Sequence, residues 1–264
     1  MDTVTSNDGT TIAFDRYGDG PAVILVGGAF QHRAIDANSK RLAELLGSDF
    51  SVFHYDRRGR GDSGDTLPYA VEREVEDLGA LIEEAGGRAH LFGMSSGGVL
   101  VVIAAAGGLP VARVALYEPP FQVEESGRSA MRSYAEQLTA LLAEGRRGDA
   151  AALAMTTFGA PPEAVEGMRQ APVWATFESV APTLAYDAAV MGDSSVPTAV
   201  ASSVTVPTAV IDGGASPPWL HQAADALASA LPDSRRITLE GQTHDVAPDV
   251  IAPALRGFFL DSAG

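Results

Sequence analysis

The sequence contains no cysteine among its 264 residues, which excludes disulfide bonds, thiolate metal sites and a cysteine nucleophile. It also lacks a long apolar run, since stretches such as residues 99–106 are too short to cross a bilayer. The first residues, Met1-Asp2-Thr3, begin neither a basic segment nor an apolar one, so we expect no signal peptide. These absences predict a soluble, cytoplasmic protein with no membrane association.

Positive charge is scarce, because 18 Lys and Arg residues stand against 34 Asp and Glu residues, for a net charge of −16. A chain this acidic repels phosphate backbones, so nucleic acid is not an expected partner. Metal-ligand spacings are missing, and Gly18-Asp19-Gly20 and Gly27-Gly28 do not form the dinucleotide fingerprint G-x-G-x-x-G. We therefore expect neither a metal nor an organic cofactor.

Short apolar runs alternate with helical stretches through most of the chain. Continuous apolar runs ended by turn residues are typical of buried parallel strands, and glycine after a helix provides a left-handed cap. The pattern predicts an α/β fold with a mostly parallel sheet covered on both faces. The predicted strands are a hairpin of 3–5 and 11–14, then 22–26, 51–55, 89–92, 111–117, 208–211 and 236–239. The predicted helices are 40–46, 71–84, 99–106 and 223–231, the first three ending at Gly47, Gly86 and Gly107-Gly108.

The alternation is interrupted between residues 121 and 203, which are alanine-rich and contain no convincing strand. Tyr134, Leu138, Leu141 and Leu142 share one helical face, and that helix ends before Gly145. We predict a helical cap formed by residues 121–203. It would be inserted into a core made of residues 1–120 and 204–264.

The segment Gly93-Met94-Ser95-Ser96-Gly97 lies between a predicted strand and a predicted helix. This is G-x-S-x-G in the strand–turn–helix setting that exposes a nucleophilic hydroxyl. Gly93 and Gly97 fit the tight turn because a Cβ there would collide with neighbouring backbone. The helix that follows directs free N–H groups and its positive end toward a developing oxyanion. The motif predicts Ser95 as a nucleophile.

With this motif the chain resembles the α/β-hydrolase superfamily over essentially its whole length. Residues 56–63, Asp-Arg-Arg-Gly-Arg-Gly-Asp-Ser, are similar to its D-x-R-G-x-G-x-S turn, whose arginines we expect to be structural. Residues 27–30, Gly-Gly-Ala-Phe, stand where the family usually has His-Gly-x. The resemblance implies an oxyanion hole made by the N–H groups of Ala29 and Ser96, which tolerates Gly27 because both donors are main-chain groups.

Five histidines are candidates for the general base that a serine nucleophile needs. His54 and His90 lie in or beside strands and are expected to be hydrogen-bonded core residues. His32 follows the first parallel strand and could line a pocket, while His221 begins a helix. His244 alone lies in the loop after the last strand, where the resemblance implies the catalytic imidazole, and we predict it as the base.

The acid that orients this imidazole is missing from its usual place. The family most often has G-x-x-D after the penultimate strand, but here Ser216 occupies the acid position. Glu118 ends the strand after the nucleophile helix, at the same sheet edge as Ser95. Certain haloalkane dehalogenases and the zearalenone-type lactonases place their acid there. The chain resembles the lactonases also in residues 95–97, Ser-Ser-Gly, and 214–217, Gly-Ala-Ser-Pro, so we predict Glu118, with Asp212 and Asp245 as alternatives.

The resemblance implies a serine hydrolase that cleaves a carboxylic ester or lactone through an acyl-enzyme. The serine nucleophile argues against the dehalogenase and epoxide-hydrolase branches, whose members use Asp. Apolar residues that either line a pocket for a small hydrophobic substrate or simply pack are Phe30, Met94, Phe158, Trp174 and Trp219. Thioester cleavage, carbon–carbon hydrolysis and perhydrolysis remain open. So does a non-hydrolytic catalyst or small-molecule receptor, which Ser216 favours.

Overall fold

The computed structural model describes residues 1–261, which form an eight-stranded sheet with the order β1-β2-β4-β3-β5-β6-β7-β8. β1 pairs with β2 and β2 with β4 in antiparallel fashion, and every later pairing is parallel. The predicted mostly parallel sheet and its opening hairpin are confirmed. The strands are β1 (Asp2–Thr5), β2 (Thr11–Tyr17), β3 (Ala22–Val26), β4 (Ser51–Tyr55), β5 (Ala89–Met94), β6 (Val111–Tyr117), β7 (Thr208–Gly213) and β8 (Ser234–Leu239).

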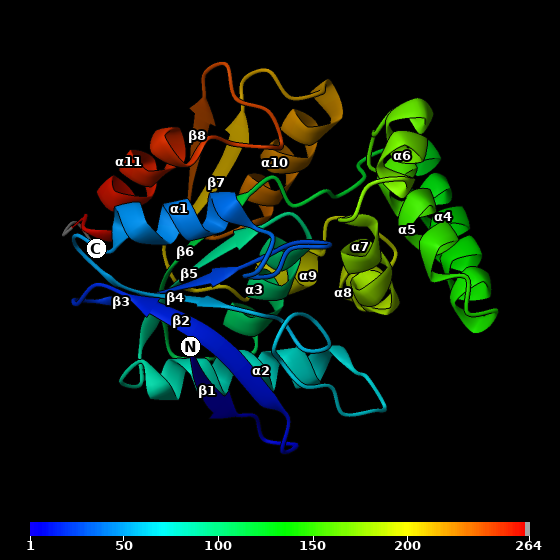
Figure 1. The fold of residues 1–264 in the computed structure, drawn as a ribbon. Coiled ribbons are helices and arrows are strands. Elements are labelled where there is room, and N and C mark those ends of the chain that lie inside the picture. The colour runs from blue at the N-terminus through cyan, green and yellow to red at the C-terminus, as the bar shows by residue number, and fades with distance from the viewer. Residues whose placement is uncertain (262–264) are drawn as a thin grey trace.

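Helices cover both faces of the sheet (Figure 1). Strands β3 and β4 are buried at every position, β3 with an entirely apolar sequence and β4 with the polar residues Ser51 and His54 among its buried side chains. One apolar cluster joins the sheet to α1 and α11, and another joins the opposite face to α2, α3 and α10. The bounds of these helices are α1 (Ala37–Leu46), α2 (Val71–Glu84), α3 (Ser96–Ala106), α10 (Pro218–Ala230) and α11 (Pro248–Phe259).

Two details differ from the sequence prediction. Helix α11 was not anticipated, because Pro253 lies inside it, although Ile251, Leu255 and Phe258 form a buried helical stripe. Gly47 was expected to be left-handed but has φ −62°, since its N–H donates to the Ala43 carbonyl and continues the right-handed turn. Gly107, directly after α3, is right-handed as well at φ −72°, whereas Gly86, Gly108 and Gly145 have positive φ.

Six α-helices and one short 3-10 helix lie between β6 and β7, and we call this segment the helical insertion. It has an apolar cluster of its own, against which Ala29 and Phe30 pack, and α4 to α6 stand to one side of the sheet (Figure 1). Its role as a cap stays a prediction. The helices are α4 (Glu125–Ala143), α5 (Arg147–Thr157), α6 (Pro162–Arg169), α7 (Trp174–Val180), η1 (Ala181–Thr183), α8 (Leu184–Met191) and α9 (Thr198–Ala201).

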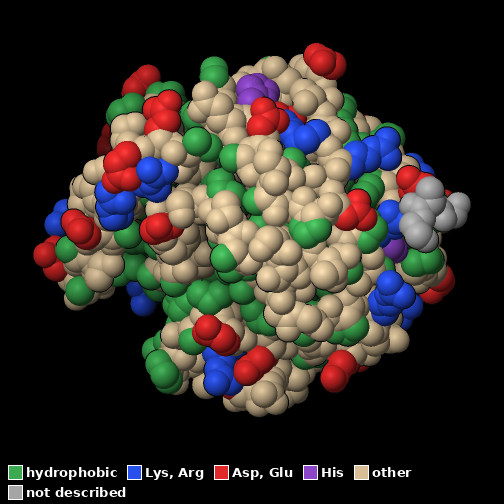
Figure 2. All heavy atoms as spheres, turned by 180° about the vertical axis from the view of Figure 1, so that it is seen from behind, with side chains coloured by type: hydrophobic (Ala, Val, Ile, Leu, Met, Phe, Trp, Pro, Cys, Tyr) green, Lys and Arg blue, Asp and Glu red, His purple; other side chains and the backbone are tan. Residues whose placement is uncertain are grey.

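Seen from behind, the molecular surface is hollowed beneath the helical insertion, and hydrophobic side chains gather in this hollow (Figure 2). Over residues 1–261, the structure contains no helix with the length and apolar character needed to span a bilayer.

Candidate active site

Ser95 lies in the sharp turn between β5 and α3, with φ 55° and ψ −129°. Its N–H donates to the Tyr117 carbonyl over 2.9 Å, which ties the turn to the neighbouring strand. A Cβ on Gly97 would overlap the Val26 carbonyl oxygen, so the close approach of these backbones requires glycine. The strand–turn–helix setting predicted from the motif is present.

Unusual backbone conformations concentrate around this turn. Among residues 1–261, four non-glycine residues have positive φ, namely Phe30, Ser95, Glu118 and Ser194. Such conformations cost on the order of 1–3 kcal/mol each and persist where surrounding contacts enforce them. Three of the four were singled out from the sequence as site residues. This concentration of strain points to a functional site.

The Glu118 carboxylate is fully buried at the end of β6 and contacts two groups from later in the chain. Its Oε2 lies 2.8 Å from His244 Nδ1, and its Oε1 accepts the Gly213 N–H over 2.8 Å. Burial raises the pKa of Glu118, but hydrogen bonds with His244 and Gly213 outweigh burial and hold that pKa below its ordinary value. The carboxylate is therefore ionised beside the imidazole at neutral pH.

His244 lies in the loop after β8, and its side chain is 43% exposed. The Tyr117 hydroxyl donates to the Thr243 carbonyl, which fastens this loop to β6. The hydrogen bonds of the described residues include none between the Ser95 hydroxyl and His244. Catalytic hydrogen bonds often tighten only in the complex with substrate.

Asp212, one alternative acid, is directed to other partners. Its Oδ2 lies 2.6 Å from His221 Nδ1 and accepts Arg236 Nη2 over 2.9 Å, while Thr238 Oγ1 donates to Oδ1 over 2.8 Å. Burial raises the pKa of Asp212, but the bonds from Arg236, His221 and Thr238 lower it overall. Asp212 is thus an ionised residue held within its own hydrogen-bonded group.

The other residues considered for the acid position do not orient His244 either. Asp245 accepts a hydrogen bond from Asn38 Nδ2 over 2.9 Å at the surface. Ser216 is buried near Glu118, and its hydroxyl makes no hydrogen bond of good geometry. Of these candidates, Glu118 is the one that the structure places on His244 Nδ1.

Ala29 and Ser96, the residues predicted to form the oxyanion hole, lie in segments next to the nucleophile. Ser96 is the first residue of α3, and the loop carrying Ala29 follows β3. A Cβ on Gly28 would lie 2.8 Å from Ser95 Cβ, so this loop is in direct contact with the turn. Outside helices and strands, the described backbone hydrogen bonds include none donated by Ala29. The oxyanion hole formed by these two amides stays a prediction.

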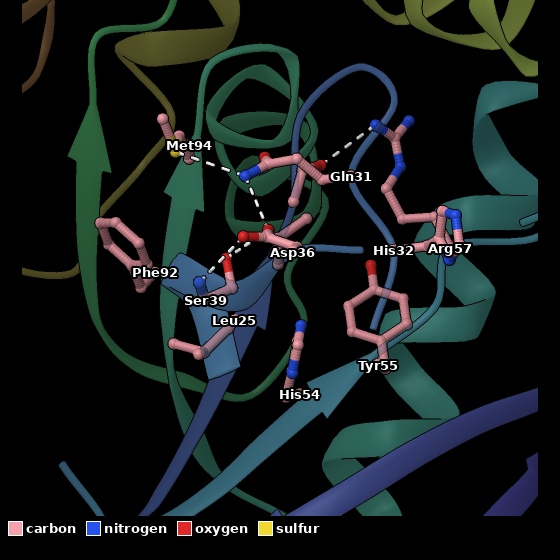
Figure 3. Close-up of a pocket in the computed structure, with 12 residues that line it drawn as sticks. Leu25, Gln31, His32, Asp36, Ser39, His54, Tyr55, Arg57, Phe92 and Met94 are labelled. Carbon is pink, nitrogen blue, oxygen red and sulfur yellow. Dashed lines mark hydrogen bonds between the residues drawn. The ribbon is translucent and has the colours of Figure 1, made fainter. Parts of the chain in front are cut away.

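A small cavity is lined by Gly27 and Gln31, which lie on either side of Ala29 in the chain (Figure 3). Its volume is about 10 Å³, room for a single water, so it is too small for an organic substrate. His32, His54 and Met94 line it, and Gln31 Nε2 donates there to Asp36 Oδ2 over 2.8 Å and to Met94 Sδ over 3.7 Å. His32 and Met94 thus line this cavity.

The prediction that the strand histidines are fully hydrogen-bonded is wrong. His54 and His90 are buried as expected, but Nδ1 of each has no partner within residues 1–261, because the surrounding strands pair with one another. Burial lowers the pKa of both rings, for His90 to about 4. Both are therefore neutral at pH 7.

The remaining apolar candidates occupy different environments. Phe30 packs edge-on against Phe177 at 5.5 Å, and Phe177 packs against Trp174 at 6.3 Å between ring centroids. Trp174 is mostly buried within the helical insertion. Phe158 and Trp219 are 53% and 40% exposed. Their roles as substrate contacts stay predictions.

Sequence reasoning missed two residues that the structure ties to this region, Tyr117 and Asp187. Asp187 is a buried carboxylate on α8 that binds the Ser96 hydroxyl and two arginines of the Asp56 turn, Arg57 and Arg60. An acidic residue inside an otherwise apolar helix is the signal that could have revealed it. The arginines are buried and ion-paired, in keeping with the structural role expected of them.

The profile of a family described as the alpha/beta hydrolase family matches residues 23–254. Similar solved structures include an alpha/beta hydrolase from Sphaerobacter thermophilus DSM 20745, with 55% identity, coverage of 98% of this chain and 100% of that chain, and a TM-score of 0.87. A thermophilic esterase from Thermogutta terrifontis has 25% identity, coverage of 97% of each chain and a TM-score of 0.72. The enol-lactonase from Burkholderia xenovorans LB400 has 23% identity, coverage of 98% and 96%, and a TM-score of 0.62, a likeness of fold. Among curated proteins, none matches this chain.

Proposed function

Because the chain belongs to the alpha/beta hydrolase family, we propose that it is a serine hydrolase that cleaves a carboxylic ester or lactone through an acyl-enzyme. The observation that carries this proposal is the 2.8 Å contact between Glu118 Oε2 and His244 Nδ1. It supplies a buried carboxylate to the imidazole although Ser216 occupies the usual acid position. The strained conformation of Ser95 adds support.

In the proposed reaction, Ser95 Oγ attacks the acyl carbon while His244 Nε2 accepts its proton. Glu118 keeps the proton of the neutral ring on Nδ1 and stabilises the imidazolium that forms. The N–H groups of Ala29 and Ser96 hold the oxyanion. His244 then returns the proton to the leaving oxygen, and water, activated by the same ring, releases the acyl group from Ser95.

A small hydrophobic substrate suits the surroundings of this site. Phe30, next to Ala29, packs on Phe177 of the helical insertion, and Ala29 itself contacts the apolar cluster of the insertion. Similar solved structures are those of an esterase and an enol-lactonase. The absence of a carboxylate at position 216 favoured a non-hydrolytic catalyst or receptor. Because Glu118 brings a carboxylate to His244, a hydrolase needs no carboxylate at position 216.

The test is to screen esters, lactones and thioesters against the wild type and Ser95→Ala, together with labelling by a fluorophosphonate. We expect turnover of a short p-nitrophenyl ester, labelling of Ser95, and a loss of kcat on the order of 10⁶ in Ser95→Ala, as in serine proteases. Ser229→Ala, which changes an exposed serine on α10, is the matched control and should behave as wild type. A wild type that shows neither labelling nor turnover would indicate a receptor.

A further inference from the structure

We propose that Asp187, on helix α8 of the insertion, is a positioning residue that orients both halves of the oxyanion hole. This inference rests on the proposed function and deepens it. The residue lies 91 positions beyond Ser96 in the sequence, yet its carboxylate is buried directly beside the start of α3. It would make the insertion a structural part of the catalytic machinery.

Three hydrogen bonds converge on the Asp187 carboxylate. The Ser96 hydroxyl donates to Oδ1 over 2.7 Å, Arg57 Nη1 donates to the same oxygen over 2.7 Å, and Arg60 Nη2 donates to Oδ2 over 2.7 Å. Burial raises the pKa of Asp187, but the charges of Arg60 and Arg57 and the Ser96 hydroxyl lower it overall. The group is therefore an anion that can hold all three donors. It anchors the side chain of the residue whose N–H is one oxyanion donor.

The same arginines reach the other half of the hole. Arg60 Nη1 donates to the Gly28 carbonyl, and Arg57 Nη1 donates more weakly to the Gly27 carbonyl over 3.3 Å. The Gly28 carbonyl and the Ala29 N–H belong to one planar trans peptide group and point in opposite directions. Fixing the carbonyl oxygen therefore fixes the direction of the N–H. Through Arg60, Asp187 sets the orientation of the second oxyanion donor.

Charge within this group is balanced. Arg57 makes two further bonds of 2.7 Å to Glu74, so two arginines face two carboxylates in a buried region. Removing the charge of Asp187 would leave a buried arginine without its counter-ion, and such a group moves toward other acceptors or solvent. Because Arg60 holds the Gly28 carbonyl, its displacement would turn the oxyanion donor.

The test compares Asp187→Asn and Ser96→Ala with a matched control. Asn at 187 keeps the size of the side chain but cannot bind two arginines as an anion, and Ala at 96 removes the hydroxyl while leaving the N–H. The control is Asp77→Asn, which breaks an equally buried carboxylate–arginine pair, formed with Arg58 of the same turn at 2.7 and 2.8 Å. Within residues 1–261, the hydrogen bonds of Arg58 reach Asp77, Asp8 and the Arg73 carbonyl, and none of them involves Ser96 or the loop that carries Ala29.

Each variant is assayed on a p-nitrophenyl ester and on the matching thionoester, whose sulfur accepts hydrogen bonds weakly. We expect kcat of Asp187→Asn to fall on the order of 10²-fold, as for a misplaced catalytic group, with KM changed less than about threefold. The kcat of Ser96→Ala should fall about tenfold. Both should lower the ratio of oxoester to thionoester rates, since this ratio reports on the oxyanion donors. Asp77→Asn should keep the wild-type ratio even if it is less stable.

An unchanged oxoester-to-thionoester ratio in Asp187→Asn would overturn the inference, even if kcat fell. If Asp187→Asn does not fold, the oxoester-to-thionoester ratio of Ser96→Ala is the test, and an unchanged ratio there overturns the inference. The proposed function fails by a different result, namely that Ser95→Ala retains the activity or that the wild type has none. Loss of activity in Ser95→Ala together with wild-type behaviour of Asp187→Asn and Ser96→Ala leaves the hydrolase intact and refutes the positioning role alone.

Discussion

Replacing Glu118 by Gln isolates the role of one charge, because the two oxygens of this carboxylate have different partners. Oε1 accepts the Gly213 N–H, and a glutamine must keep its carbonyl oxygen there, since an NH₂ group would face another donor. The NH₂ group then faces His244 Nδ1. Because it donates, Nδ1 must become the acceptor, and the ring proton moves to Nε2. The nitrogen that should take the Ser95 proton is then already occupied.

The expected loss follows from this tautomer change. By analogy with the same substitution in serine proteases, kcat should fall on the order of 10⁴-fold. That factor corresponds to about 5 kcal/mol of transition-state stabilisation. KM should change little, because Glu118 is fully buried and does not touch substrate. Steady-state hydrolysis of a p-nitrophenyl ester measures both constants, and the rate of fluorophosphonate labelling should fall in parallel.

Asp212→Asn and Asp245→Asn are the matched controls, since each neutralises a carboxylate near the same loops. Asp212 binds His221 and Asp245 binds Asn38, so neither change alters the tautomer of His244. Both variants should keep kcat within about tenfold of wild type. The reasoning is refuted if Glu118→Gln is nearly as active as wild type while one of these two controls is crippled.

Two further predictions concern stability and the histidine loop. Burial, with Arg113 and Arg88, lowers the pKa of His90 from 6.5 to about 4, so below pH 6.5 the unfolded chain binds the proton first and stability falls as pH falls. The free energy of unfolding should fall by about 2 kcal/mol at pH 5 relative to neutral pH. In chemical denaturation between pH 6.5 and 4, the free energy of unfolding of His90→Phe should depend less on pH than that of the wild type. Equal slopes for the two proteins would contradict this prediction. Tyr117→Phe removes the hydrogen bond to the Thr243 carbonyl, so kcat should fall about tenfold and the free energy of unfolding by about 1 kcal/mol. A larger effect on KM than on kcat would argue against a positioning role for Tyr117.

Local sequence determined the elements and the candidate nucleophile. Strands β3 and β4 fall at the predicted residues, because a strand buried on both faces is mostly apolar, although β4 also buries Ser51 and His54. The turn at Ser95 was equally readable, since Gly97 is needed wherever the backbones of a turn and a neighbouring strand approach closely. Helix α11 was missed because Pro253 is locally unfavourable in a helix, and packing against the sheet compensates for it.

Which carboxylate contacts which base depended on tertiary structure. Glu118, Asp212 and Asp245 all follow or end strands at one edge of the sheet, so sequence order left three candidates for one histidine. The direction of the side chains decides which carboxylate contacts His244. Glu118, whose φ is positive, contacts His244, whereas Asp212 bonds to His221. Local reasoning could mark Asp187 only as an acidic residue in an apolar helix and could not identify its partners. A carboxylate on one element and its arginines more than a hundred residues away become neighbours only when the chain has folded, because no local periodicity encodes contacts between distant segments.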